Sequence, residues 1–463
     1  MKNILAFCLM VLSCTFVQAK TYNVTSFGAK GDGRNIDSEA INKAIEQASA
    51  DGGGTVYIPA GNYACYSIQL KSHITLYFES GAKLIAEFPT ADAGYDKAEE
   101  NSFSQYQDFG HSHWKNSLIW GIGLEDITIC GPGKIYGKGL SREESRLAGA
   151  GNKAISLKLC KNVIIKDLTM IRCGHFAVLA TGVDNLSLLN IKVDTNRDGF
   201  DIDCCNNVRI TDCTVNSPWD DAIVLKASYA LGYFKPVQNV TITGCYVSGF
   251  DQGSVINATW QTDEPQAPDH AGNCGRIKLG TESSGDYKNI AISNCIFEHC
   301  RGLAIESVDG GHVEDVTVDN ITMRDIVNSP IFLRLGARQR SPKGTPLGTM
   351  KRIRISNITV YNADSQYSNI ISGVPGNKIE DVTLSNINIY HKGGYSQADS
   401  NRVIPEQEKV YPDPLMFGTI PASGFYVRHA KGIIFDRVNF HFEQPDGRPL
   451  YMTDDAEIVR YDK

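Results

Sequence analysis

The sequence predicts an all-β fold, a right-handed parallel β-helix of about ten coils with a short capping helix at its N-terminal end. Two observations lead to this prediction. A seven-residue phrase with alternating apolar positions recurs through most of the chain, and the last position of every clear copy is apolar. A helical pattern precedes the first copy, where the open end of a solenoid needs a cover.

The repeated phrase consists of an Asn, Asp or similar polar residue, an aliphatic residue, alternating apolar positions, and a second polar residue before a final apolar one. Neighbouring clear copies start 22 to 50 residues apart, so the shortest interval sets the unit and longer intervals carry insertions. Short alternating strands in a unit of this length are typical of a parallel β-helix. The clear copies are NVIIKDL (162–168), NLSLLNI (185–191), NVRITDC (207–213), NVTITGC (239–245), NIAISNC (289–295), DVTVDNI (315–321), RIRISNI (352–358) and DVTLSNI (381–387), and weaker copies start at Asp126 and Gly432.

The last position of each phrase should form one interior column, because stacked coils place equivalent side chains above one another. All eight clear copies are apolar there, and three have cysteine, which we expect to behave as a small buried hydrophobe. Eleven cysteines follow residue 19, an odd number, and no CxxC pair occurs, so we expect neither a disulfide framework nor a bound metal. The column is Leu168, Ile191, Cys213, Cys245, Cys295, Ile321, Ile358 and Ile387.

The first 19 residues have the features of an export signal, namely a positive start, an apolar run and a small-residue exit at Ala19. We expect cleavage near Ala19 and export to the periplasm or the medium, which leaves residues 20–463 as a single β-helix domain. Attachment as a lipoprotein through Cys14 fits less well, because apolar residues follow this cysteine. No apolar run is long enough for a membrane span.

A helix is expected just after Asp37, which can cap it. The apolar residues that follow have the helical period, so one face of the helix can cover the first coil. These residues are Ala40, Ile41, Ala44, Ile45 and Ala48.

Three aspartates are expected on one side of the solenoid. Asp198 lies twelve residues after Leu186 of its phrase, and Asp220 lies twelve after Val208. They should therefore stack on successive coils, about 4.8 Å apart, with Asp221 beside them. His175 has the same offset in the coil before.

Like charges at this spacing raise one another's pKa, which is a requirement of general acid catalysis. One protonated carboxyl group can donate a proton to a glycosidic oxygen while an ionised one activates water. The alternative is that these aspartates cap turns or bind calcium. Three in register, two of them consecutive, favour catalysis.

Two segments one coil apart, NRDGFDID (196–203) and SPWDDAIVLK (217–226), resemble the NTD and DD motifs of glycoside hydrolase family 28, the polygalacturonase-like enzymes. The resemblance covers nearly all of the chain after the export signal, including FGAKGDG (27–33) and VYIPAGNY (56–63). It implies inverting hydrolysis of pectic α-linkages without a cofactor. It also implies Asp220 as the general acid, with Asp198 and Asp221 positioning the attacking water as base.

Two family motifs are altered. Gly275, in CGRIKLGTES (274–283), stands where the histidine of the GHG motif is expected. Ala304 and Glu306, in GLAIES (302–307), replace the two cations of the RIK motif, which usually bind the substrate carboxylate. Standard endo-cleavage of polygalacturonan is therefore in doubt.

The alternation of side chains along a strand indicates which residues could replace the missing cations of the RIK motif. If Ile277 and Leu279 point inward, Arg276 and Lys278 point outward, one coil beyond the aspartate pair, and Arg276 is the first choice for a uronate clamp. The alternative is a solvated charge ladder or salt bridges to Asp201 and Asp203. The full set of expected substrate-binding residues is His175, Asp201, Lys226, Arg276, Lys278 and Arg334, and Glu306 shares their face.

Three long insertions, residues 249–273, 336–350 and 393–426, must leave the solenoid as loops. Loops beside the carboxylates could close one end of a cleft, which suggests exo-action. Exposed aromatic residues could stack on sugar rings, although core or loop packing is the commoner use of any one of them. The candidates are Trp219, Tyr233, Phe234 and Trp260.

The expected partner is an acidic plant-type polysaccharide or oligosaccharide, and the expected state is a monomer. The formal charge of -7 gives no overall attraction to nucleic acid. Two other classes stay open, because a β-helix does not fix function. One is a pectate-lyase-type enzyme with calcium held by Asp198, Asp201 and Asp203, and the other is a non-catalytic carbohydrate-binding solenoid.

Overall fold

The computed structural model describes residues 20–142, 149–264 and 272–461. The expected export signal, with Cys14, lies outside these ranges. Within them, no helix has the length and apolar character needed to cross a membrane.

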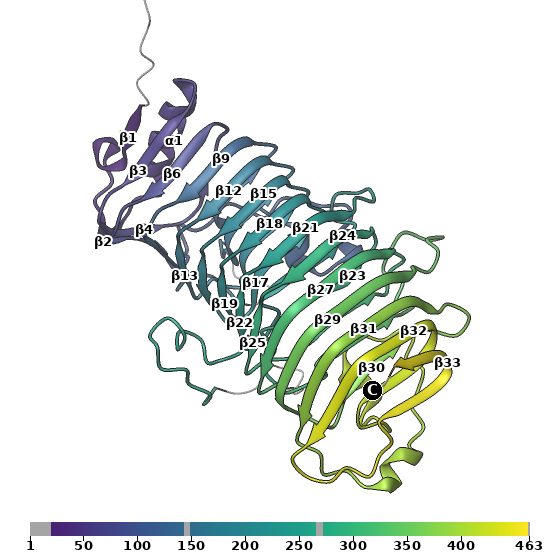
Figure 1. The fold of residues 1–463 in the computed structure, drawn as a ribbon. Coiled ribbons are helices and arrows are strands. Elements are labelled where there is room, and N and C mark those ends of the chain that lie inside the picture. Colours follow the sequence, from purple (N-terminus) through teal and green to yellow (C-terminus); the bar gives the residue numbers. More distant parts are fainter. Residues whose placement is uncertain (1–19, 143–148, 265–271, 462–463) are drawn as a thin grey trace, which may run out of the picture.

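The described chain forms a right-handed parallel β-helix, as predicted, and its coils run in order from one end of the molecule to the other (Figure 1). The repeated phrases form one face, in which each strand pairs in parallel with the next. The ten strands from β9 to β32 hold the eight clear and two weaker copies. The strands are β1 (Thr21–Asn23), β3 (Gly54–Ile58), β6 (Ile74–Phe78), β9 (Glu125–Cys130), β12 (Lys161–Lys166), β15 (Asp184–Leu189), β18 (Asn206–Thr211), β21 (Val237–Thr243), β24 (Tyr287–Ser293), β27 (Val313–Arg324), β29 (Met350–Ala363), β31 (Ile379–His391), β32 (Phe425–Phe442) and β33 (Tyr451–Tyr461).

A second face carries the aspartates, and we call it the acidic face. Its last strands pair with the start of β32. The strands are β5 (Ile68–Gln69), β8 (Ser117–Ile122), β11 (Lys153–Lys158), β14 (Phe176–Thr181), β17 (Asp198–Asp203), β20 (Ile223–Ala227), β23 (Ile277–Ser283), β26 (Leu303–Ser307), β28 (Ile331–Leu335) and β30 (Asn369–Ser372).

The third face is continued at its C-terminal end by the second halves of β27, β29, β31 and β32. It consists of β2 (Asp32–Ile36), β4 (Gly61–Cys65), β7 (Ala82–Ala86), β10 (Lys134–Tyr136), β13 (Thr169–Ile171), β16 (Lys192–Asp194), β19 (Thr214–Asn216), β22 (Tyr246–Ser248) and β25 (Ile296–Glu298). Short 3-10 helices lie between strands: η1 (Val24–Phe27), η2 (Ser104–Tyr106), η3 (Phe109–Ser112), η4 (Gln397–Asn401) and η5 (Pro414–Phe417).

The register of the repeats is the predicted one. Val163 pairs with Leu186, Leu186 with Val208, and Val208 with Val240. The eight residues of the predicted interior column are each 2% exposed or less. The eleven described cysteines are all unpaired and buried, which confirms that Cys213, Cys245 and Cys295 serve as small apolar residues.

The polar residue that opens each phrase has a conformational reason. Asn162, Asn185 and Asn207 have φ values of 54°, 60° and 57°, in the left-handed region that Asn tolerates better than most residues. Their amides also form a ladder between coils, with Asn185 donating to Asn162 at 2.9 Å and Asn207 donating to Asn185 at 2.7 Å. Each asparagine therefore turns the chain and ties one coil to the next.

The predicted helix is present as α1 (Ser38–Ala50), at the N-terminal end of the solenoid (Figure 1). Its buried side includes Ile41, Ala44 and Ile45, and it packs on β1, β3 and β5. The expected capping by Asp37 is wrong in one respect. Asp37 occupies the N-cap position, but its carboxylate accepts hydrogen bonds from the backbone nitrogens of Lys30 and Gly31 and none from the helix.

Replacement of Asn185 should separate the two roles of this residue. Asn185→Gly keeps access to positive φ and loses only the ladder, so it should cost about 1 kcal/mol. Asn185→Val also forces a β-branched residue into the left-handed region, which adds about 1–2 kcal/mol. Denaturant unfolding followed by circular dichroism compares the two, and equal losses would exclude a conformational role.

Candidate active site

The three aspartates lie at the start of two neighbouring strands of the acidic face. Asp198 is the first residue of β17, and Asp220 and Asp221 directly precede β20. Phe200 pairs with Ile223, so Asp221, and not Asp220, is level with Asp198. The preceding strand places Phe176, and not His175, opposite Asp198. The predicted offsets were thus wrong by one residue at both positions.

The cause is a change in loop length between the third face and the acidic face. Val193 pairs with Val215, 22 residues later, whereas Phe200 pairs with Ile223, 23 residues later. One extra residue therefore lies between β19 and β20. The phrase-based count could not detect it, because the phrase lies on another face.

The cluster nevertheless forms. Side-chain atoms of His175, Asp198 and Asp220 lie within 4.8 Å of one another, and the same holds for Asp220, Asp221 and Cys274. Asp198 and Asp221 are each 3% exposed, whereas the Asp220 side chain is 26% exposed. The structure thus brings the three carboxylates together, with Asp220 on the solvent side. Their catalytic role stays a prediction.

Asp221 is held by two cations from the next coil. Arg276 Nε donates to its Oδ1 at 2.8 Å, and Lys278 Nζ lies 3.2 Å from its Oδ2. Burial acts to raise the pKa of Asp221, but Lys278 and Arg276 lower it more, so the pKa lies well below the ordinary carboxyl value. Asp221 is therefore ionised near neutral pH.

The pKa of Asp198 is shifted in the opposite direction. Burial raises its pKa, and repulsion from Asp220 raises it further, so that it lies well above the ordinary value although Lys226 opposes the shift. Oδ1 of Asp198 is buried and has no hydrogen-bond partner among the described residues. The cluster thus combines a carboxyl group that keeps a proton with one that does not.

Lys226 and Asp201, which were predicted to bind substrate, belong to a buried network below the cluster, and their contact with substrate stays a prediction. Asp201 is fully buried, 2.8 Å from both Lys226 Nζ and His111 Nε2. Lys226 also lies 3.6 Å from Glu282 and 3.9 Å from Asp198. Its ammonium group neutralises several acids, and it occupies the space between the ligand-type atoms of His111, Asp198 and Asp201.

Arg276 and Lys278 point outward as predicted, and both are buried; the binding of a uronate by Arg276 stays a prediction. They also lie 3.9 and 3.7 Å from Glu306, which stands where the family motif has a cation. Burial raises the pKa of Glu306 to about 7, against the lowering effect of Lys278 and Arg276. The alternative of salt bridges to Asp201 and Asp203 is wrong, because the partners are Asp221 and Glu306.

Arg334 was also predicted to bind substrate, which stays untested. It is buried, and its guanidinium donates to the backbone carbonyls of Gly373, Glu406 and Gln407. It therefore fixes the 393–426 insertion and does not reach the carboxylates.

Two insertions lie against the cluster region. Tyr411, from the 393–426 insertion, accepts a hydrogen bond from Lys278 at 3.0 Å, and Asp413 lies 2.9 Å from Arg301. Arg340, from the 336–350 insertion, pairs with Asp108 at 2.9 Å. These loops cover the acidic face on the C-terminal side of the aspartates. His111, Tyr411 and Asp413 were not predicted, because loop residues carry no repeat register.

The entrance side contains cations and aromatic residues. Arg197 lies 2.9 Å from Asp220, and Arg142 stacks on Trp219 with a distance of 5.2 Å to the ring centre. Tyr233, Phe234 and Trp260, which were predicted to stack on sugar rings, are about half exposed, and Tyr233 and Phe234 follow the end of β20 opposite to Asp220 and Asp221. The stacking itself stays a prediction.

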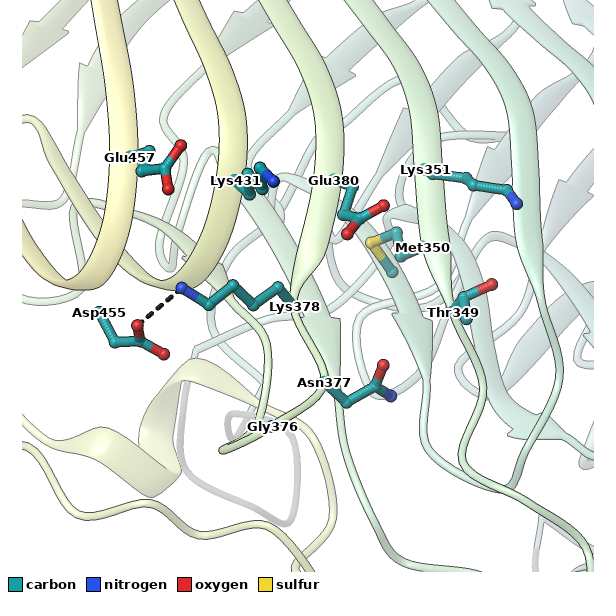
Figure 2. Close-up of a pocket in the computed structure, with 10 residues that line it drawn as sticks. All are labelled: Thr349, Met350, Lys351, Gly376, Asn377, Lys378, Glu380, Lys431, Asp455 and Glu457. Carbon is teal, nitrogen blue, oxygen red and sulfur yellow. Dashed lines mark hydrogen bonds and ion pairs between the residues drawn. The ribbon is translucent and has the colours of Figure 1, made fainter.

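A separate cavity of about 500 Å³ lies near the C-terminal end of the solenoid (Figure 2). Charges alternate along its wall, as in Lys351, Glu380 and Lys431 on successive strands. Lys378 pairs with Asp455 at 2.7 Å across it. None of the predicted catalytic or substrate-binding residues lines this cavity.

Glu306→Gln should change how folding stability depends on pH. In the unfolded chain Glu306 loses its proton near pH 4.5, whereas the folded chain keeps it up to about pH 7. Folding stability should therefore fall as pH rises through this window, by about 3 kcal/mol, and the glutamine variant should lack this fall. Denaturant unfolding at pH 4.5 and pH 8 tests it, with the exposed Glu380→Gln as control. A stability gain that is equal at both pH values would contradict the buried titration.

Comparisons with known proteins agree with the fold and the motifs. A family model described as rhamnogalacturonase A/epimerase, pectate lyase-like, matches residues 21–117, and one described as a right handed beta helix region matches residues 134–267. A probable polygalacturonase of Vitis vinifera is 24% identical over 412 residues, covering 82% of this chain and 75% of the relative.

An exo-poly-alpha-D-galacturonosidase of Dickeya chrysanthemi is 24% identical over 444 residues, covering 89% of this chain and 70% of the relative. The structure of a family 28 exopolygalacturonase of Yersinia enterocolitica has a TM-score of 0.66 at 16% identity, covering 96% of this chain and 78% of that one. The sequence matches span most of this chain and the structural match supports the fold. The chain is thus similar over most of its length to polygalacturonases, and these findings support a family 28-like β-helix protein.

Proposed function

We propose that this protein is a glycoside hydrolase that cleaves α-linked galacturonic acid in pectic polysaccharides or rhamnogalacturonan oligosaccharides, from the chain end and with inversion. The observation that supports this best is the cluster of Asp198, Asp220 and Asp221, in which one carboxyl group favours its proton and another favours its charge. Environments that push two carboxyl pKa values apart are a common basis of acid and base roles.

The proposed reaction uses Asp198 and Asp220 as one proton-holding pair. Asp220, the exposed member, delivers the proton to the glycosidic oxygen. A water molecule attacks the anomeric carbon and gives its proton to ionised Asp221. The leaving sugar gains the proton from Asp220, and the other sugar gains the hydroxyl group of the water. Asp221 then returns its proton through solvent to the Asp198–Asp220 pair, which restores the initial protonation state.

The close spacing of the carboxylates also occurs in retaining glycosidases, in which a carboxylate about 5 Å from the acid attacks the sugar. Neither inner aspartate is suited to that attack. Asp221 has both oxygens in ion pairs, and Asp198 favours the protonated form. We therefore propose inversion.

Exo-action is supported by the insertions that cover the acidic face beyond the cluster. Tyr411 and Asp413 are placed against Lys278 and Arg301, so a long polymer has little room to continue in that direction. The relative from Dickeya chrysanthemi is itself named an exo-acting galacturonosidase. We also propose export after cleavage near Ala19, and action as a monomer.

Asp220→Asn should lower kcat on the true substrate by roughly 10²–10⁴-fold, because asparagine cannot donate the proton as an acid. Asp212→Asn, at an exposed turn position where other coils carry asparagine, is the matched control and should keep wild-type activity. Mass spectrometry of products from polygalacturonan and rhamnogalacturonan oligomers identifies the bond, and proton NMR identifies the first anomer. A β-anomer product supports inversion, and wild-type turnover by Asp220→Asn would refute the assigned acid.

The pH dependence of kcat/KM should show loss of activity on the alkaline side. The acid must carry a proton, and the raised pKa of Asp198 keeps one in the Asp198–Asp220 pair above the ordinary carboxyl range. Asp221 remains ionised to low pH, so the acidic limb should lie below pH 4. Initial rates from pH 3 to 9 measure both limbs, and an alkaline limb at about pH 4 would contradict the shared proton.

A further inference from the structure

The cations that were expected to bind the substrate carboxylate are all engaged by other groups of the protein. Arg276 and Lys278 are buried and paired with Asp221, and Arg334 is used by the 393–426 insertion. Lys226 is buried among acids. If the substrate is a uronic acid, a different cation must meet its carboxylate.

Arg197 is the cation at the exposed edge of the carboxylate cluster. Its side chain is 22% exposed, and one Nη lies 2.9 Å from Asp220 Oδ2 and 3.3 Å from His175 Nε2. Its backbone carbonyl accepts a hydrogen bond from Ser217 at 2.6 Å, which ties it to the coil that carries Asp220. A guanidinium group has five N–H donors in a planar fork that fits a carboxylate.

Polar atoms without partners occur on the two chain neighbours of Arg197 and on His175, which contacts it. Both amide atoms of Asn196, Nδ1 of His175 and Oδ1 of Asp198 are buried and have no hydrogen-bond partner within the described parts of the chain. Asn196 is fully buried and precedes Arg197 directly. Such a concentration of unsatisfied groups is rare in folded proteins and points to a bound polar ligand or ordered water.

The resting contact between Arg197 and Asp220 opposes the proposed chemistry. A guanidinium group beside a carboxylate favours the charged carboxylate, whereas a general acid must carry a proton. The neutral His175 ring offers only a weak second contact, because burial and Arg197 hold its pKa well below the ordinary value. Stacking on Phe176 at 4.4 Å fixes the ring in place.

We propose that Arg197 forms a uronate-binding site. The substrate carboxylate replaces Asp220 as the ion-pair partner of Arg197, and the proton of the Asp198–Asp220 pair can then move to Asp220. This rests on the proposed function. No bond to carbon changes in this step, since one proton passes between two carboxyl groups and one ion pair replaces another. A sugar without a carboxylate leaves Arg197 on Asp220, so the same residue selects uronic acids and controls the acid.

The test compares trigalacturonate with its methyl-esterified form, on the wild type, Arg197→Gln and Arg197→Lys. The wild type should prefer the free acid by about 100-fold in kcat/KM, as a charged pair of roughly 3 kcal/mol would give. Arg197→Gln should lose about 100-fold on the free acid and little on the ester, so the preference falls towards one. Arg197→Lys should keep part of it, because it retains the charge but not the fork.

A second readout is the alkaline limb of kcat/KM on the ester. Removal of the cation beside Asp220 should move this limb to higher pH in Arg197→Gln, which a merely structural role would not do. If both variants keep the wild-type preference and the wild-type limb while thermal melting shows them folded, the inference is overturned and the proposed function stands. If Arg197→Gln does not fold, the Arg197→Lys comparison decides.

Failure of the proposed function has a different signature. The wild type would then release no galacturonate from either trimer. Calorimetry with trigalacturonate still tests the site, since binding by the wild type that is lost in Arg197→Gln supports a carboxylate site. Equal binding by both proteins overturns it.

Discussion

The stacking register between coils is the constraint on which the site depends. The residue that opens each clear phrase has the left-handed conformation, and where it is Asn162, Asn185 or Asn207 its amide ties neighbouring coils together. The strands that follow are therefore spaced by about 4.8 Å, which brings Asp198 and Asp221 to one level on successive strands. In a less regular fold, carboxyl groups from distant parts of the chain would need additional interactions to hold them this close together.

A buried acidic cluster is costly, and the structure offsets the cost with cations from the adjoining coil and strand. Lys226 lies below Asp198 and Asp201, and Arg276 and Lys278 lie beside Asp221. Removing one partner of such a buried set typically costs 3–5 kcal/mol, because the other charge is left without compensation. These cations compensate the charge of the site. Arg276 and Lys278 lower the pKa of Asp221, whereas burial and Asp220 raise the pKa of Asp198 against the effect of Lys226.

Residues at fixed positions of the repeat were placed correctly from the sequence. Residues in the segments between repeats were misplaced or missed. The column from Leu168 to Ile387 is buried as expected, since each member occupies a fixed place in a phrase. The level of Asp220 was misplaced by one residue, because loop lengths outside the phrase vary. His111, Tyr411 and Asp413 come from insertions, where neither period nor spacing gives a register. Burial of Asp201 and Arg334 could not be predicted either, since the covering loops have no pattern.

The change of a family cation to Glu306 has consequences for the whole acidic face. Arg276 and Lys278 lie 3.9 and 3.7 Å from this acid, and Lys278 donates a hydrogen bond to Tyr411 at 3.0 Å. These two cations become part of the wall behind Asp221, where a sugar carboxylate does not reach them. In the proposed mechanism, an anionic sugar is therefore bound on the solvent-exposed side of the cluster. The cation on that side is Arg197, which pairs with Asp220. Under the role proposed for Arg197, this one side chain responds to both the substrate charge and the protonation of Asp220, so selection of the sugar and activation of the acid are one event.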